Sequence, residues 1–287
     1  MKYAAEVTEH GAATIVSAIG SLYGVAMGVS LKTRAKVSMT DDGGNALEID
    51  AGEGMDHRLV RECVRQARLN GMANGSLSVS IETQIPPAKG MKSSSSVSLA
   101  VIGAIASCSG REMSSTELLH MSARASVGAG VSITGAFDDA AACHYGGIVF
   151  ASNRGMRVLR RLELKDGYGV HFCIPGRSIS KESLPMDEIR RHSAEMKGMY
   201  RKALSGKFRD ACMSNTLLLC SLLDIDPAPA LDAAGSGALL SGLTGTGPAF
   251  FALADRERSE EVVSALSPYG RIITTVPRGV SSDGIAF

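Results

Sequence analysis

Alternation of apolar and polar side chains marks the strands of this chain, and a spacing of three to four residues marks its helices. In the clearest strand, Leu77, Val79 and Ile81 alternate with polar residues before two prolines end the pattern. The clearest helix follows a glycine–serine segment and runs from Val97 to Cys108. The same patterns predict strands at 25–31, 35–40, 46–50, 148–150, 158–164, 170–174 and 272–276. They predict further helices from Asp56 to Gly71, from Ser114 with a capping box to Glu117, and at 187–204, 208–223, 229–234 and 259–266.

A change in these patterns near residue 166 divides the chain in two. Strands and helices mix before this point, whereas helical stretches dominate after Gly167. A chain of 287 residues is long for one hydrophobic core, so two packed domains are expected. We therefore predict an α+β protein with domains at 1–166 and 167–287.

Composition and charge restrict the kinds of molecule that this protein is expected to bind. The 30 lysines and arginines nearly balance the 29 aspartates and glutamates, which argues against a nucleic-acid partner. The basic stretch at 154–165 is typical of a strand with one solvated face. Six cysteines occur without a C-x-x-C pair, and we expect them to be reduced core residues. The chain has no run of about 18 apolar residues and no signal pattern, so we expect a cytoplasmic protein without a membrane partner.

The segment from Pro86 to Ser96 carries the strongest chemical signal. It lies between a predicted strand and a predicted helix, and it ends in four consecutive serines beside two lysines. The amides and hydroxyls at a helix start, together with the helix dipole, form an anion site, to which Lys92 adds a charge. A serine hydroxyl is also a suitable ligand for Mg²⁺. The alternative is that the serines only cap the helix, but one serine suffices for a cap, so the pattern favours a phosphate site. It is not a Walker A loop, because the G-x-x-x-x-G-K-[ST] pattern is absent from this position.

Two further segments contain candidate site residues. Asp138 and Asp139 are adjacent carboxylates beside an apolar run, and either could orient or deprotonate an acceptor hydroxyl. The alternative is a helix start with favourable charges in its first turn. The glycines of the segment 241–249 permit close approach of the backbone to a ligand or to the serine segment, or they form a simple tight hairpin.

Together these segments resemble the motifs of the GHMP kinase superfamily. Gly90 to Ser96 is similar to its central serine motif, the segment 134–147 to the part that holds its catalytic aspartate, and the segment 241–249 to its carboxyl-terminal glycine motif. The likeness spans about residues 10 to 255, and it is strongest to the archaeal-type shikimate kinases. It implies a two-domain fold, with a ribosomal protein S5 domain 2-like first domain and a ferredoxin-like second domain, and phosphoryl transfer from ATP with Mg²⁺ to a small-molecule hydroxyl.

The resemblance also implies roles for individual residues. The nucleotide would be bound by Pro87, Ala88, Lys89, Gly90, Met91, Lys92, Ser93, Ser94, Ser95 and Ser96. Ser94 would contact Mg²⁺, Asp138 would act as the catalytic carboxylate with Asp139 as a rival, and Lys92 would assist. The substrate side of the cleft would be formed by Thr244, Gly245, Thr246 and Gly247.

The chain differs from some members of the superfamily in the residues expected to bind the metal ion. Some members carry a magnesium-binding glutamate before the aspartate, but residues 124–131 contain no acidic side chain here. If the acceptor is shikimate, its carboxylate needs a cation, because burial of an unpaired charge is costly. The candidates are Lys32, Arg34, Arg124 and Arg177. Homoserine kinase, or another GHMP small-molecule kinase, is the alternative activity, and a non-catalytic nucleotide or metabolite sensor is the alternative of another class.

Overall fold

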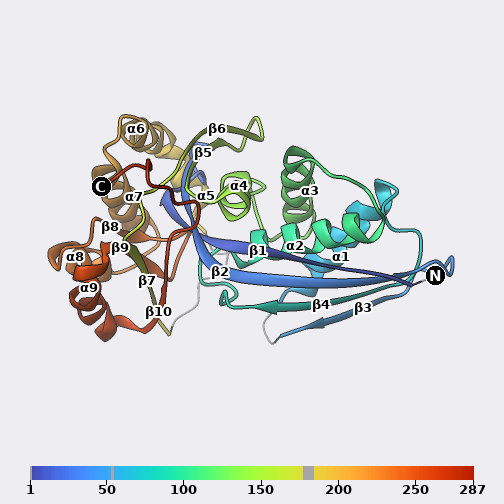
Figure 1. Cartoon of the computed structure of the whole chain (residues 1–287). Helices are drawn as coiled ribbons and strands as arrows, with labels where there is room; N and C mark the ends of the chain where they lie inside the picture. Colours follow the sequence, from blue (N-terminus) through green and yellow to red (C-terminus); the bar gives the residue numbers. More distant parts are fainter. Residues whose placement is uncertain (1, 53–54, 177–183) are drawn as a thin grey trace.

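The computed structural model describes residues 2–52, 55–176 and 184–287. Two antiparallel-rich sheets, each covered by helices, lie end to end in it (Figure 1). The predicted α+β class is therefore confirmed. Arg177 lies outside the described residues.

The first sheet has six strands. They are β1 (Lys2–Val16), β2 (Tyr23–Thr40), β3 (Leu47–Ala51), β4 (Leu77–Thr83), β5 (Ile148–Ser152) and β6 (Arg157–Leu162). The strand order is β3-β4-β2-β5-β6, with β1 paired to β2, and among the strands of the described residues only the β3–β4 pair is parallel. The two strands predicted at 25–31 and 35–40 form one continuous strand, β2. They join because residues 32–34 stay paired with β1, and Thr33 also pairs with Thr83 of β4, to which it is hydrogen-bonded (Oγ1–Oγ1 2.7 Å).

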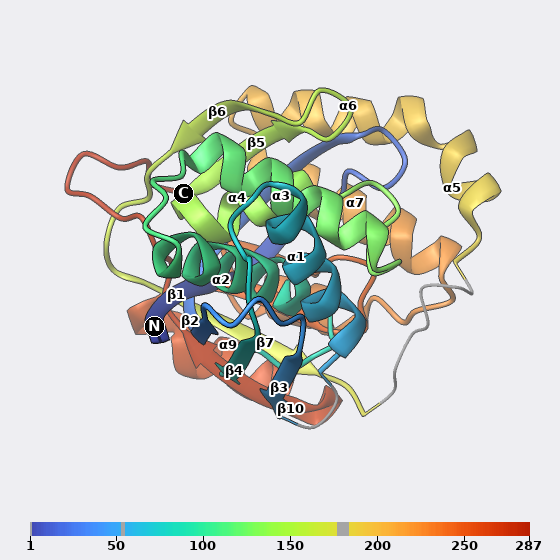
Figure 2. The same cartoon turned by 90° about the vertical axis from the view of Figure 1, so that its right-hand side faces the viewer.

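Four helices pack on one face of this sheet (Figures 1 and 2). They are α1 (His57–Leu69), α2 (Ser93–Cys108), α3 (Ser115–Gly128) and α4 (Phe137–Tyr145). Asp56 caps α1, and Ser114 and Glu117 form a capping box on α3, so both predicted helix starts are confirmed. Helix α2 is buried on nearly all sides at the centre of this layer. Its amino-terminal end is therefore placed by packing around the whole helix.

The second sheet has four antiparallel strands in the order β10-β7-β9-β8. These strands are β7 (Tyr168–Ile174), β8 (Leu240–Leu243), β9 (Phe250–Asp255) and β10 (Arg271–Thr275). The accompanying helices are α5 (Met186–Arg191), α6 (Ser193–Leu204), α7 (Phe208–Leu222), α8 (Ala228–Gly235) and α9 (Ser259–Leu266), with 3₁₀ turns at Arg256–Arg258 and Ser267–Tyr269. The predicted helix at 187–204 is instead two helices, because the backbone leaves helical angles at His192 (φ −87°, ψ 11°).

The two sheets share buried apolar residues. Phe150 of β5, Phe172 of β7 and Phe251 of β9 belong to one hydrophobic cluster. The segment after β10 returns to the first sheet, where Arg278 N–H donates to the Gly28 carbonyl (2.9 Å). The predicted boundary at 166 falls between β6 and β7 and stays a prediction. All six cysteines are buried, as expected, and no helix within the described ranges is long and apolar enough to cross a membrane.

Candidate active site

The amino-terminal end of α2 opens onto a cleft of about 380 Å³. Lys92 occupies the N-cap position in the left-handed region (φ 68°, ψ 30°), and within the described residues no side chain caps this helix end. The first turn of a helix presents amide groups that have no partner inside the helix, and these carry the positive end of its dipole. The uncapped end of α2 is therefore suited to bind an anion.

The structure brings the predicted nucleotide-binding segment to this cleft almost intact. The cleft is lined by Pro87, Ala88, Lys89, Gly90, Met91, Lys92, Ser93, Ser94 and Ser95. Ser94 is the only one of the four consecutive serines that is not buried. Ser96 is fully buried and absent from the cleft wall, and its hydroxyl has no hydrogen-bond partner among the residues that the structure describes. Ser96 therefore lies away from the cleft, and its predicted role in nucleotide binding stays a prediction.

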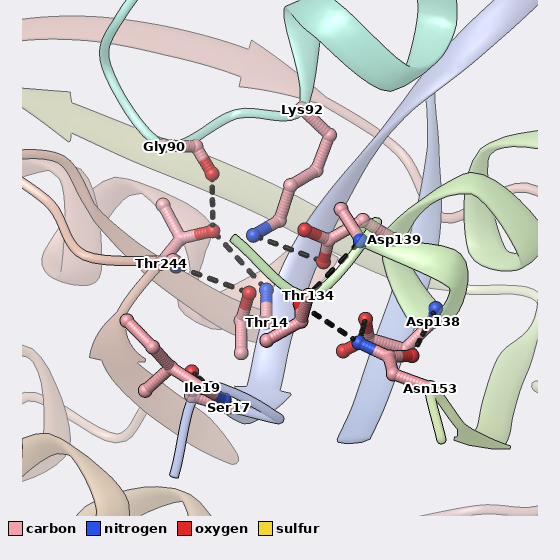
Figure 3. A network of polar contacts seen from close by, with 12 residues as sticks. Thr14, Ser17, Ile19, Gly90, Lys92, Thr134, Asp138, Asp139, Asn153 and Thr244 are labelled. Carbon is pink, nitrogen blue, oxygen red and sulfur yellow. Dashed lines mark hydrogen bonds and ion pairs between the residues drawn. The ribbon is translucent and has the colours of Figure 1, made fainter. Parts of the chain in front are cut away.

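The glycine segment (residues 241–249) is hydrogen-bonded to the serine segment (residues 86–96). Thr244 Oγ1 donates to the Gly90 carbonyl (2.9 Å) and accepts from the Thr14 amide (3.1 Å), and Gly245 N–H donates to Thr14 Oγ1 (3.0 Å) (Figure 3). Gly90 has φ +81°, and a Cβ there would lie 2.1 Å from the Thr244 carbonyl oxygen. A glycine is therefore required at this crossing. Thr244 is fully buried and makes the hydrogen bonds that connect the two segments. Gly245, Thr246 and Gly247 line the cleft.

Lys92 and Asp139 form an ion pair at the junction of these segments. Their Nζ–Oδ1 distance is 3.0 Å, and the two side chains are only 6% and 19% exposed. The lysine side chain points from the start of α2 toward the first turn of α4 (Figure 3). It therefore lies beside the carboxylate, between the serine segment and the glycine segment, instead of extending into solvent.

Asp138 occupies a different environment from Asp139. Its carboxylate accepts from Asn153 Nδ2 (2.8 Å), and a Cβ on Gly24 would lie 2.0 Å from its Oδ2 atom. Within the described chain, Asp139 lines the cleft and Asp138 does not. Burial, and then the charge of Asp139, raise the pKa of Asp138 to about 7, while the Asn153 hydrogen bond and Lys92 oppose this rise. The structure therefore places Asp138, the predicted catalytic carboxylate, away from the cleft wall, and Asp139, its predicted rival, is the carboxylate that the cleft exposes.

The cations expected to bind a substrate carboxylate lie elsewhere. Lys32 and Arg34 are on the solvent-facing side of β2, where Arg34 pairs with Glu6 (3.2 Å), and Arg124 is exposed on α3. As far as the structure describes the chain, none of the three lines the cleft. The cations on its wall are Arg58, Lys89 and Lys92. Strand alternation turns the side chains of positions 32 and 34 toward solvent, and the role predicted for these cations stays a prediction.

Sequence reasoning also missed residues that shape the cleft. Thr14 and Ser17 line it from the end of β1, where Ser17 N–H donates to Asn215 Oδ1 (2.9 Å). Asn153 sits just beyond β5 and contacts Asp138. These positions carry common polar residues without a distinctive spacing, so only the folded chain reveals them.

Comparisons with known proteins fit this fold and this cleft. Family models match residues 58–147 (GHMP kinases N terminal domain) and 229–271 (GHMP kinases C terminal). The mevalonate kinase structure from Methanococcus jannaschii is similar with a TM-score of 0.76, at 14% identity over 96% of this chain and 98% of that one. The homoserine kinase structure from Cytophaga hutchinsonii is similar with a TM-score of 0.72, at 18% identity over 96% of each chain. The predicted two-domain GHMP kinase fold is confirmed.

Two curated relatives are similar at higher identity. The shikimate kinase of Methanothermobacter thermautotrophicus is 32% identical over 265 residues, which cover 90% of each chain. The shikimate kinase of Pyrococcus abyssi is 34% identical over 267 residues, which cover 92% of this chain and 96% of that one. The chain therefore belongs to the GHMP kinase family of ATP-dependent small-molecule kinases.

Proposed function

We propose that this enzyme transfers the γ-phosphoryl group of ATP to a hydroxyl of shikimate, which yields shikimate 3-phosphate and ADP in aromatic amino acid biosynthesis. The observation that carries the proposal is that the uncapped start of α2 and the Lys92–Asp139 ion pair line the same cleft. An anion site beside a carboxylate is what phosphoryl transfer requires. The curated shikimate kinases at 32% and 34% identity favour shikimate as the acceptor.

The residues at the cleft suit a nucleotide triphosphate with Mg²⁺. The first amides and serine hydroxyls of α2 would hold the phosphates, and the accessible Ser94 hydroxyl would contact the metal ion. No group of three or more histidine, cysteine, aspartate or glutamate side chains able to hold a metal occurs in the described ranges. Mg²⁺ fits such a site because it keeps several waters and uses few protein ligands besides the phosphates, whose charge it neutralises.

Asp139 and Lys92 would act at the acceptor. The Asp139 carboxylate accepts a hydrogen bond from the shikimate hydroxyl and takes its proton as the oxygen attacks the γ-phosphorus. The bond from that phosphorus to the bridging oxygen breaks, and ADP leaves with the electron pair. Lys92, 3.0 Å from Asp139, pairs with this carboxylate and faces the charge of the transferred group. A non-catalytic sensor would need neither the carboxylate nor its lysine.

Steady-state kinetics of two matched variants test these roles. With ATP, Mg²⁺ and shikimate, Asp139→Asn should lower kcat by about 10²- to 10⁴-fold, as loss of a general base does. Asp138→Asn should keep kcat within about tenfold of the wild type, because its neutral side chain can still accept from Asn153. The reverse order of the two effects would transfer the catalytic role to Asp138.

An acceptor panel tests the substrate. Shikimate, homoserine, mevalonate and galactose would each be offered with ATP and Mg²⁺, and shikimate should give the highest kcat/KM. Preference for homoserine would replace the proposed substrate while keeping the reaction class. ATP binding without turnover on any acceptor would instead support the sensor.

A further inference from the structure

Helix α4 presents both aspartates, yet its own sequence does not cap it. Its N-cap residue is Ala136, which lies in the left-handed region (φ 49°, ψ 41°) and has no side chain able to accept from the first turn. Such a backbone conformation costs an alanine free energy and persists only when the surroundings hold it. The first turn of α4 therefore depends on groups from other parts of the chain.

Asn153, which follows the last residue of β5, supplies the missing cap. Its Oδ1 atom accepts from the Asp138 amide (3.0 Å), and its Nδ2 atom donates to the Asp138 carboxylate (2.8 Å) (Figure 3). One side chain thus fixes both the backbone and the side chain of the residue before Asp139. An amide is suited to this position because it offers an acceptor and a donor together.

The same asparagine connects two other segments of the site. Its Nδ2 atom also donates to Thr134 Oγ1 (3.2 Å), and Thr134 lines the cleft. Its backbone N–H donates to the Leu22 carbonyl (2.8 Å), next to the start of β2. The side chain is buried, with the residue only 4% exposed. Asn153 therefore holds the approach to α4, the helix start and the β1–β2 connection in one arrangement.

We propose that Asn153 is a positioning residue, which sets the first turn of α4 and thereby aims the Asp139 carboxylate at the acceptor. This inference rests on the proposed role of Asp139. Asn153 acts through Asp138, whose carboxylate is confined between the asparagine amide and the Gly24 backbone. The adjacent Asp139 shares this helical turn, so a change in the hydrogen bonds of Asp138 alters the distance between Asp139 and Lys92.

A single variant of Asn153, and a double variant in which the side chains of residues 138 and 153 are exchanged, test this role. Asn153→Asp places a second carboxylate against Asp138 and removes the donor, and we expect kcat to fall about 10- to 100-fold, as a misplacement of about 1 Å does. KM for ATP should stay within about twofold, because the phosphate segment is untouched. The double variant Asn153→Asp/Asp138→Asn restores one donor and one acceptor, and it should recover kcat to within about threefold of Asp138→Asn alone.

A stability-matched control separates positioning from general destabilisation. Val262→Ala removes two methyl groups from a fully buried side chain in α9, in a cluster away from the cleft, so it should lower Tm and leave kcat unchanged. Unchanged kcat in Asn153→Asp, or a double variant no more active than Asn153→Asp, would overturn the inference. A crystal structure of Asn153→Asp decides it independently of any acceptor, because an Asp139–Lys92 pair kept at 3.0 Å would also overturn it. Failure of the wild type to phosphorylate shikimate would count against the proposed function alone.

Discussion

Asp138 should make the stability of this protein depend on pH in a direction opposite to that of most carboxylates. Its folded pKa is about 7, whereas the ordinary value is 3.8, because burial and the charge of Asp139 disfavour the ionised form. Between these two pH values the folded protein binds the proton and the unfolded chain does not. The stabilisation is therefore complete below about pH 4 and is lost as the pH rises through 7.

The size of this effect follows from the difference between the two pKa values. One unit corresponds to about 1.4 kcal/mol, so ionisation of Asp138 withdraws about 4 kcal/mol of folding free energy between pH 4 and pH 8. Asp138→Asn removes this dependence, because an amide stays neutral at every pH. The new NH₂ group would lie against Gly24 and cost about 1–3 kcal/mol, but this cost is the same throughout the range. The prediction concerns the slope with pH and not the absolute stability.

Urea unfolding of the wild type and of Asp138→Asn at intervals from pH 4.5 to pH 8 measures this slope. The wild type should lose about 2–4 kcal/mol relative to the variant across the range. Asp210→Asn is a suitable control, since it removes the same charge from an exposed position, and its curve should run parallel to that of the wild type. Parallel curves for the wild type and Asp138→Asn would refute the argument that Asp138 is buried without full compensation.

Three further substitutions probe the cleft and the helix that presents Asp139. Gly245→Ala would put a Cβ 3.0 Å from Lys92 Nζ, so kcat should fall about tenfold or more. Gly43→Ala is the control, because Gly43 has a similar positive φ but a Cβ there would have no atom within 4 Å. This variant should only lower Tm. Arg278→Ala removes the guanidinium group that donates to the Cys143 and His144 carbonyls in the last turn of α4 and should cost about 1–3 kcal/mol in urea unfolding, with Arg278→Lys intermediate. Ser94→Ala should raise the Mg²⁺ concentration for half-maximal rate about tenfold, as a titration of the rate against Mg²⁺ would show.

Local sequence was sufficient to predict the phosphate-binding element. A strand that alternates up to Ile81, a proline–glycine turn and an apolar helix after four serines specify a strand–turn–helix unit whose helix start must face outward. The structure begins α2 at Ser93 and lines the cleft with this turn. Such a unit is specified by residues that are close together in the sequence, so it can be recognised from the sequence alone.

The partner of each catalytic candidate could not be predicted in this way. Lys92 pairs with Asp139 because its own backbone turns into the left-handed region and because α4 packs beside α2. Neither fact has a sequence signal, since lysine is an uncommon residue at such a backbone angle. The distinction between Asp138 and Asp139 depends likewise on Gly24 and Asn153, which lie in β2 and just after β5. Adjacent residues on a helix face different surroundings, and only tertiary packing decides which one meets the cleft.

The positions of unusual backbone angles connect these observations. Six of the described residues other than glycine have positive φ. Four of them, Leu22, Ala88, Lys92 and Ala136, lie on the cleft wall or are hydrogen-bonded to a residue that shapes it. Left-handed angles cost such residues about 1 kcal/mol each, and they persist where packing and hydrogen bonds enforce them. Lys92 and Ala136 are also the N-cap residues of α2 and α4. At these two positions the strain falls on helix starts that have no caps of their own, one proposed to face the phosphates and the other presenting Asp139. A conventional serine or aspartate cap at either position would relieve the strain, but it would also occupy amides that the site needs for its ligand or for Asn153.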